Sequence, residues 1–172
     1  MRAGGGHAKG AEFERKFAKE LSRWASHGDR DDVFWRTPGS GSRATRVPAV
    51  AHGGDICATH EIGRAFCEHV LVECKCYKKI DWRLLLMDRK GEFYAFWTKL
   101  VKEAHDQHKI PLIVLKENGR PVVLGTVCGE FNPILGTRAP LVNSCIGMSV
   151  YKQEALLEQA YELVCTRLRS SA

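Results

Sequence analysis

The segment VLVECKC (residues 70–76) carries two charged side chains at a spacing that a strand would place on one face. Successive side chains of an extended chain point to opposite faces, so Glu73 and Lys75 would share a face with Leu71 and Tyr77. The other face is small or apolar and suits a buried core. The first face therefore presents a carboxylate and an ammonium two residues apart inside a strongly β-forming segment, and one interpretation is that they belong to a functional site. The alternative is an edge strand whose charged pair simply faces water.

Asp55 follows two glycines in GGDIC, where a second strand is expected to begin. If that strand neighbours VLVECKC, Asp55 and Glu73 converge, and the two carboxylates repel each other unless a hard cation lies between them. Magnesium prefers oxygen ligands and is commonly held by one or two carboxylates with waters and phosphate oxygens. Lys75 would then lie beside the attacking water and stabilise charge developing on phosphorus. The alternative is that an Asp after Gly-Gly is ordinary turn chemistry.

Glu14, in FERKF, lies about one residue step off an apolar helical stripe. A glutamate at that border is usually solvated or paired with a nearby lysine, here Lys16 or Lys19. It could instead reach over the sheet towards the same cation or its water, which would make it a third acidic member of the site.

Four motifs occur in a recognisable order, namely KGAEFER (9–15), RTPGSGS (36–42), GDI (54–56) and VECK (72–75). In this the chain resembles the PD-(D/E)XK nuclease superfamily and, within it, the archaeal-type Holliday junction resolvases. Three features depart from that branch: Gly54 replaces the usual proline, the loop from Ser42 to Asp55 is longer, and the segment after Tyr77 is more like phage-encoded endonucleases. The departures leave the site intact but bear on which DNA structure is recognised.

The resemblance implies a metal-dependent DNA endonuclease that hydrolyses phosphodiester bonds with an activated water, most simply in four-way or branched DNA. It implies Mg²⁺, with Mn²⁺ as substitute and no organic cofactor, held by Asp55, Glu73 and the backbone carbonyl of Cys74. Lys75 would assist the water and Glu14 would complete the catalytic set, with a possible role as metal ligand. Two alternatives stay open: a duplex-specific phage or restriction-type endonuclease, and a DNA-binding module with a relict site.

The charge of the chain favours a polyanionic partner. Its formal net charge is +6, and a basic balance of this kind permits binding to nucleic acid without proving it. Residues 51–74, which contain Asp55 and Glu73, are acidic, whereas both flanking segments are basic. The expected DNA contacts combine cations and hydroxyls, and they are Arg36, Ser40, Ser42, Arg43, Arg46, Lys78 and Lys79.

The periodicity predicts an α/β sandwich of the restriction-endonuclease type, with a central mixed sheet flanked by helices. Residues 1–10 are expected to be a flexible, basic, Gly-rich terminus and residues 11–172 a single nuclease domain. The predicted elements are a helix over 13–24, strands at 33–36, around 54–59 and over 65–75, a helix over 91–108, a hairpin around 117–120 and a last helix starting near 153.

Composition excludes several classes of protein. No apolar run approaches the roughly 18 residues of a membrane span, and the N-terminal segment has no apolar stretch typical of a secretory signal. We therefore expect a cytoplasmic protein without membrane contact, in the host cytoplasm if it is phage-encoded.

Seven cysteines, an odd number without any CxxC, are expected to be thiols. Cys67, His69, Cys74 and Cys76 form the nearest approach to a zinc cluster, but small buried thiols are the better interpretation. His105 and His108 are expected on the surface.

A homodimer is predicted from the reaction, since resolving a four-way junction needs two symmetry-related cuts. The helices expected over 91–108 and from about 153 carry more apolar side chains than one stripe can bury, and the excess is the expected material of the dimer interface. The side chains considered are Tyr94, Phe96, Trp97, Leu156, Leu157 and Tyr161.

Overall fold

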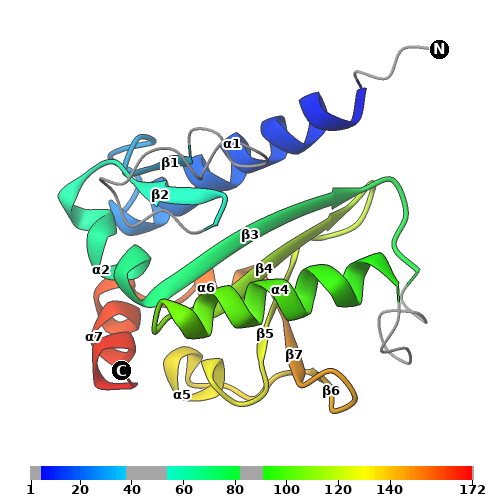
Figure 1. Ribbon diagram of the computed structural model, residues 1–172. Coiled ribbons are helices and arrows are strands. Elements are labelled where there is room, and N and C mark those ends of the chain that lie inside the picture. Colours follow the sequence, from blue (N-terminus) through cyan, green and yellow to red (C-terminus); the bar gives the residue numbers. More distant parts are fainter. Residues whose placement is uncertain (1–4, 38–53, 82–90, 172) are drawn as a thin grey trace.

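The computed structural model describes residues 5–37, 54–81 and 91–171, which build a twisted sheet with helices on both of its faces (Figure 1). The helices are α1 (Gly5–Ala25), α2 (Glu61–His69), α4 (Glu92–Asp106), α5 (Phe131–Leu135), α6 (Glu154–Leu157) and α7 (Tyr161–Ser171). The strands are β1 (Phe34–Arg36), β2 (Ile56–Ala58), β3 (Val70–Tyr77), β4 (Ile110–Glu117), β5 (Val123–Val127), β6 (Leu141–Asn143) and β7 (Met148–Lys152).

The main sheet has five strands in the order β3-β4-β5-β7-β6. β3 and β4 run parallel and the remaining neighbours are antiparallel, so the sheet is mixed. β1 and β2 form a separate antiparallel pair. The expected restriction-endonuclease-like α/β architecture is confirmed. Among the described strands β3 lies at an edge of the main sheet, and this matters for the site.

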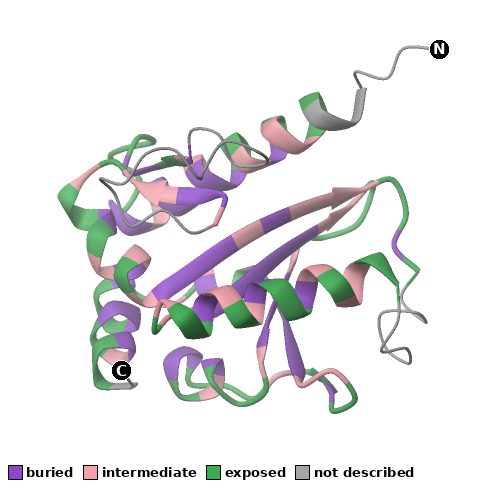
Figure 2. Cartoon of the chain, in the orientation of Figure 1, coloured by how far each residue is buried: buried purple, intermediate pink, exposed green. Residues whose placement is uncertain are grey.

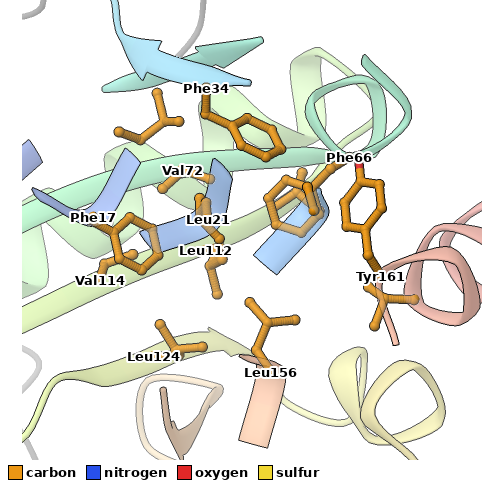
Figure 3. Close-up of a cluster of buried hydrophobic side chains, with 14 of the residues drawn as sticks. Phe17, Leu21, Phe34, Phe66, Val72, Leu112, Val114, Leu124, Leu156 and Tyr161 are labelled. Atoms are coloured by element: carbon orange, nitrogen blue, oxygen red, sulfur yellow. The ribbon is translucent and has the colours of Figure 1, made fainter. Parts of the chain in front are cut away.

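Two apolar clusters cover the two faces of the sheet, because alternate side chains of β3 and β4 point to opposite sides. Val72 and Leu112 face α1, α2 and α7, with Phe17, Leu21 and Phe66 in the same cluster (Figure 3). On the other face, the second cluster joins residues of the sheet to α4. Its buried members are Leu71, Ile80, Trp97, Leu100, Ala104, Ile113, Leu115, Met148 and Val150. The buried run of β3 gives way to half-buried residues towards Tyr77 (Figure 2).

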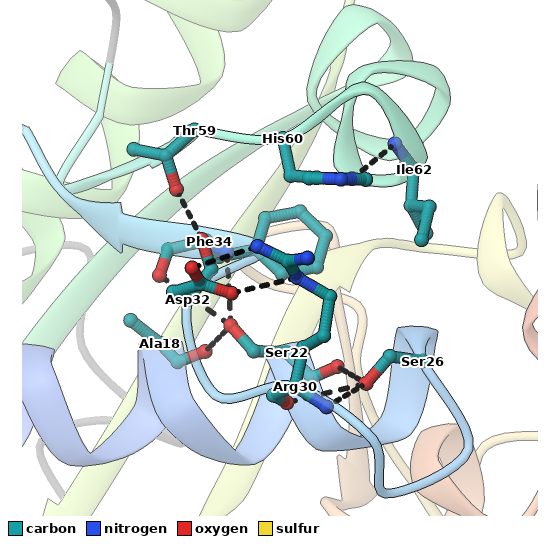
Figure 4. A network of polar contacts seen from close by, with 9 residues as sticks. All are labelled: Ala18, Ser22, Ser26, Arg30, Asp32, Phe34, Thr59, His60 and Ile62. Carbon is teal, nitrogen blue, oxygen red and sulfur yellow. Dashed lines mark hydrogen bonds and ion pairs between the residues drawn. The ribbon is translucent and has the colours of Figure 1, made fainter.

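The hydroxyl of Ser22 joins α1 to β1 (Figure 4). Buried Ser22 Oγ donates to the carbonyl of Ala18 at 2.8 Å and accepts from the N–H of Phe34 at 2.8 Å. Thr59 Oγ1 donates to the carbonyl of Asp32 at 2.6 Å, which ties the end of β2 to the same loop. These bonds fix β1 and β2 against α1 and so determine where Arg36 and Asp55 lie relative to Glu14.

The prediction of one long strand over residues 65–75 is wrong for its first half. Residues 61–69 form α2, which begins after His60, whose ring accepts from the N–H of Ile62. Gly63 and Phe66 are its buried residues, and a methyl group at Gly63 would lie only 2.9 Å from the ring of Phe34. Close packing of this helix against Phe34 therefore outweighs the β-forming composition of the segment.

The two ends of the chain also differ from expectation. α1 already begins at Gly5, so residues 5–10, expected in a flexible terminus, are helical. The last helix is broken into α6 and α7, and between them the carbonyl of Gln159 accepts from the indole Nε1 of Trp24 at 2.8 Å.

The remaining elements follow the sequence closely. The apolar stripe of α1 is buried at Phe13, Phe17 and Leu21, α4 covers the predicted range, and β4 and β5 form the predicted hairpin. Across the described parts of the chain, no helix is both long and apolar enough to span a membrane.

Candidate active site

Asp55 lies against the open edge of β3, immediately before β2. Its N–H donates to the carbonyl of Val72 at 2.7 Å, and its Oδ2 accepts from the N–H of Cys74 at 2.8 Å. An edge strand presents unpaired backbone groups, and Asp55 pairs two of them, one through its backbone and one through its carboxylate. The carboxylate is thereby fixed beside the strand that carries Glu73, as the sequence predicted.

Gly54 explains why this chain departs from the family proline at the position before the aspartate. Gly54 has φ of +84°, which proline, fixed near about −65°, cannot adopt. A Cβ at this position would also collide with the carbonyl oxygen of Val72. The glycine therefore lets the backbone approach β3 closely enough for Asp55 to reach Cys74.

Glu73 and Lys75 lie on the face of β3 that is partly covered by α4. Lys75 Nζ is 2.5 Å from Glu73 Oε1, and the two side chains are 22% and 26% exposed. The ammonium also lies 4.5 Å from the centre of the Phe96 ring. The alternative of a charged pair that simply faces water does not describe these side chains, because most of their surface is covered.

Glu14 is paired with Arg36, and this pair connects α1 to β1. Arg36 Nε donates to Glu14 Oε2 at 2.8 Å, and the Glu14 side chain is only 13% exposed. The two nearby lysines pair elsewhere, since Lys16 approaches Glu20 and Lys19 pairs with Asp31. Glu14 is therefore not the solvated flank of the alternative interpretation.

The charges of the predicted site residues shift the pKa values of Asp55 and Lys75. Burial, together with the charges of Glu73 and Glu14, raises the pKa of Asp55 to about 6 against the lowering effects of the Cys74 N–H and Lys75. Burial alone would lower the pKa of Lys75, but the hydrogen bond and charge of Glu73, with the charge of Asp55, raise it overall. Lys75 is therefore a cation at neutral pH.

These donors fit a hard divalent cation. The carboxylates of Asp55 and Glu73 supply oxygen ligands, and burial of like charges leaves Asp55 in need of a positive neighbour. Within the described ranges, no three side chains of His, Cys, Asp or Glu come together as a metal-holding group. A cation here would rely on two carboxylates together with carbonyl and water oxygens, a set that Mg²⁺ commonly uses.

The predicted DNA contacts are only partly described. Arg36 lies at the site in its pair with Glu14, and Lys78 and Lys79 are exposed directly after β3. Ser40, Ser42, Arg43 and Arg46 lie outside the described residues.

The cysteines are free thiols, as expected. Cys67 lies on α2 rather than on β3, and Cys74 is buried in the core on the α1 side. Burial raises the pKa of Cys67 to about 12, which is typical of an inert buried thiol. His105 and His108 are exposed, as predicted.

The aromatic residues offered for a dimer interface are largely used within the chain. Trp97 is 2% exposed and its Nε1 donates to the carbonyl of Ile146, while Tyr161 is 4% exposed and donates to the carbonyl of Ile62. Leu156 is buried in the core. These three side chains are therefore taken up by the fold, whereas Tyr94, Phe96 and Leu157 of the same set are only half-buried.

Sequence reasoning missed two contacts of the site. Arg36 was expected to bind DNA and not to pair with Glu14, and Phe96 was not connected with Lys75. Neither partner is close in sequence, since 22 residues separate Glu14 from Arg36. Only the position of Phe96 beside the inner stripe of its helix gave a signal, because that position brings a side chain to the border of the sheet.

Comparison with known proteins agrees with this geometry. Residues 5–169 match the family described as "Phage putative PDDEXK endonuclease". No curated protein and no solved structure matches the chain. The matched range includes Glu14, Asp55, Glu73 and Lys75 and covers nearly the whole chain, so the protein belongs to this family of phage PD-(D/E)XK endonucleases.

Proposed function

We propose that the protein is a divalent-metal-dependent DNA endonuclease that acts on four-way or otherwise branched DNA. The observation that carries the proposal is the attachment of Asp55 to the edge of β3, where its carboxylate accepts from Cys74 N–H and lies in the field of Glu73. Family membership supports the nuclease activity. The motif order KGAEFER, RTPGSGS, GDI and VECK supports the junction substrate through its resemblance to resolvases.

Asp55 and Glu73 are proposed to hold Mg²⁺, with Mn²⁺ as a substitute. The carbonyl of Cys74 is a suitable third ligand, because the N–H and C=O of a strand residue point to the same side and its N–H points to Asp55. When bound, the metal would supply Lewis acidity to a phosphate oxygen and lower the pKa of water. A bound cation would stabilise the ionised form of these two largely buried carboxylates.

Lys75 and Glu14 are proposed to assist the reaction beside these metal ligands. Lys75 is cationic and held by Glu73, so it can stabilise negative charge on the phosphate but not take a proton from water. Glu14 accepts from Arg36 Nε and so orients a guanidinium, a group that forms strong charge-assisted hydrogen bonds to phosphate. Arg36, Lys78 and Lys79, with the undescribed Ser40, Ser42, Arg43 and Arg46, are the proposed DNA contacts.

The test is cleavage of a labelled synthetic four-way junction against a duplex of matched arm sequence, in Mg²⁺ and in EDTA. We expect cleavage only with metal and preferentially in the junction. Asp55→Asn and Glu73→Gln should each lower the rate by at least about a hundredfold while DNA binding persists, because the cationic contacts remain. Glu68→Gln, which changes an exposed carboxylate of α2, is the matched control and should cut normally.

Other results would redirect the proposal. Equal cleavage of the duplex would favour a duplex-specific phage or restriction-type enzyme, which uses the same chemistry. Binding without cleavage in both Mg²⁺ and Mn²⁺ would favour a DNA-binding module with a relict site.

A homodimer remains part of the proposal, because two symmetric cuts need two sites. Sedimentation equilibrium with and without junction DNA should give the mass of two chains, and a single-chain mass under both conditions would remove the dimer.

A further inference from the structure

The ring of Phe96, on α4, lies beside the ammonium of Lys75, on β3. The distance from Lys75 Nζ to the ring centre is 4.5 Å, within the roughly 6 Å at which a cation is attracted to an aromatic face. The Lys75 side chain is only 22% exposed. Partial removal of water strengthens such a contact relative to one on an open surface.

Packing of the core does not account for this ring. In the described part of the chain, the two apolar clusters do not include Phe96, although its neighbours Phe93, Trp97 and Leu100 pack in the cluster beneath α4. Phe96 lies one residue step off that inner stripe. The contact that the structure gives this ring is with the Lys75 ammonium.

The helix that carries Phe96 is held firmly against the sheet. Trp97 and Leu100 are 2% and 4% exposed, and Trp97 Nε1 donates to the carbonyl of Ile146 at 2.8 Å. A side chain adjacent to Trp97 thus has a fixed place above β3, and the ring is supplied by a rigid element instead of a loop.

We propose that Phe96 is a positioning residue that holds the Lys75 ammonium at the active site through a cation–π contact. The inference rests on the proposed nuclease function. An ammonium has three N–H donors, and within the described residues Lys75 donates to Glu73, which is also a proposed metal ligand. The ring holds the cation without a hydrogen-bond acceptor that would compete for the donors, so they remain directed to phosphate.

The experiment replaces Phe96 by Leu, by Tyr and by phenylalanines with increasing numbers of ring fluorines. Fluorine withdraws charge from the ring face while largely preserving its shape, so the rate constant of cleavage should fall stepwise with each fluorine. Phe96→Leu should lose about tenfold in kcat, with junction affinity within about twofold of wild type, and Phe96→Tyr should restore most of the rate.

Phe93→Leu is the matched control. Phe93 lies on the same helix and packs against the apolar cluster, so its loss should lower the melting temperature and leave kcat near that of wild type. A wild-type rate for Phe96→Leu, or equal rates across the fluorine series, would overturn the inference.

A second measurement does not depend on cleavage. In the nuclear magnetic resonance spectrum, the ε-methylene protons of Lys75, assigned by their loss in Lys75→Arg, should be shifted upfield by the ring and return to ordinary positions in Phe96→Leu. Absence of that shift refutes the contact. An intact shift in a protein that cuts no DNA refutes the proposed nuclease function and with it the catalytic role of the ring.

Discussion

At the scale of single residues, Asp55 shows how a fold can hold a carboxylate in an unfavourable state. The residue is 8% exposed, and burial with the charges of Glu73 and Glu14 raises its pKa to about 6. The one backbone N–H that it accepts from does not offset this. An ionised Asp55 therefore costs folding free energy in the metal-free protein, and a bound cation would recover it.

The first prediction concerns the pH dependence of that cost. The pKa of Asp55 is higher in the folded chain than the unfolded value of about 3.9, so the folded state binds the proton more tightly. The stability from this group is complete below about pH 3.9 and is lost as the pH rises through about 6. In EDTA, Asp55→Asn should gain on wild type, by about 2 kcal/mol more at pH 7.5 than at pH 4.5.

Denaturant unfolding at the two pH values measures this difference, and any constant cost of the amide cancels between them. Asp29→Asn, at an exposed position, should show no such trend. Excess Mg²⁺ should stabilise wild type but not Asp55→Asn at pH 7.5. An advantage of Asp55→Asn that is equal at both pH values would contradict the assigned pKa.

The second prediction concerns Gly54, which has φ of +84° and lies against the Val72 carbonyl. Gly54→Ala should lose about 3 kcal/mol of stability or more, since it adds a collision to the cost of the positive φ. Gly129 has φ of +86° with no atom near its missing Cβ, so Gly129→Ala measures the conformational cost alone, about 1 kcal/mol. Urea unfolding of both variants measures the two losses of stability. Equal losses would show that a close approach of Gly54 to the Val72 carbonyl adds nothing to the cost.

At the scale of elements, the sequence predicts best where the apolar period is long and unbroken. The stripe of α1, the range of α4 and the β4–β5 hairpin are confirmed. α2 was mistaken for strand because Ala65–His69 has a mixed composition, and its helical state depends on the packing of Gly63 and Phe66 against Phe34. A contact between residues that distant in sequence cannot be read from local periodicity.

The contacts of the site likewise divide into those that local sequence predicts and those that depend on tertiary packing. The alternation of β3 places Glu73 and Lys75 on one face, and the approach of Asp55 to that strand was predicted from the strand expected to begin at GGDIC. The pairing of Glu14 with Arg36 and the contact of Phe96 with Lys75 were not, because both depend on how α1 and α4 pack on the sheet. Element identity is local, whereas these contacts are tertiary.

The third prediction tests the junction between α1 and β1. Ser22→Ala should leave the buried N–H of Phe34 without its 2.8 Å acceptor and cost about 1–3 kcal/mol. Ser170→Ala is matched to it, because Ser170 makes the same bond to a carbonyl four residues earlier but is exposed, and it should change stability by less than about 0.5 kcal/mol. Thermal and denaturant unfolding measure the stability of both variants. If Ser22→Ala leaves the stability unchanged, β1 is held to α1 by packing alone.

At the scale of the whole molecule, the acidic segment that carries Asp55 and Glu73 lies between basic segments of the sequence. The net charge is +6, yet residues 51–74 are acidic, and the fold brings that segment to the open edge of the sheet. A polyanion is attracted to the molecule as a whole but repelled locally by the carboxylates. Under the proposed function, basic side chains near β3 would hold the DNA backbone across them.

The last prediction tests that distribution through salt dependence. Lys79 is exposed just beyond the end of β3, so Lys79→Ala should weaken binding to junction and duplex alike and reduce the slope of log K against log salt by about one. Arg169 is exposed on α7, which lies at the opposite end of β3 (Figure 1), and Arg169→Ala has the same change in net charge. Fluorescence anisotropy over a range of salt concentrations should separate them, because a phosphate contact releases counterions and a remote charge does not. Equal slopes for both variants would mean that DNA responds to the overall charge of the molecule and that Lys79 is no part of its path.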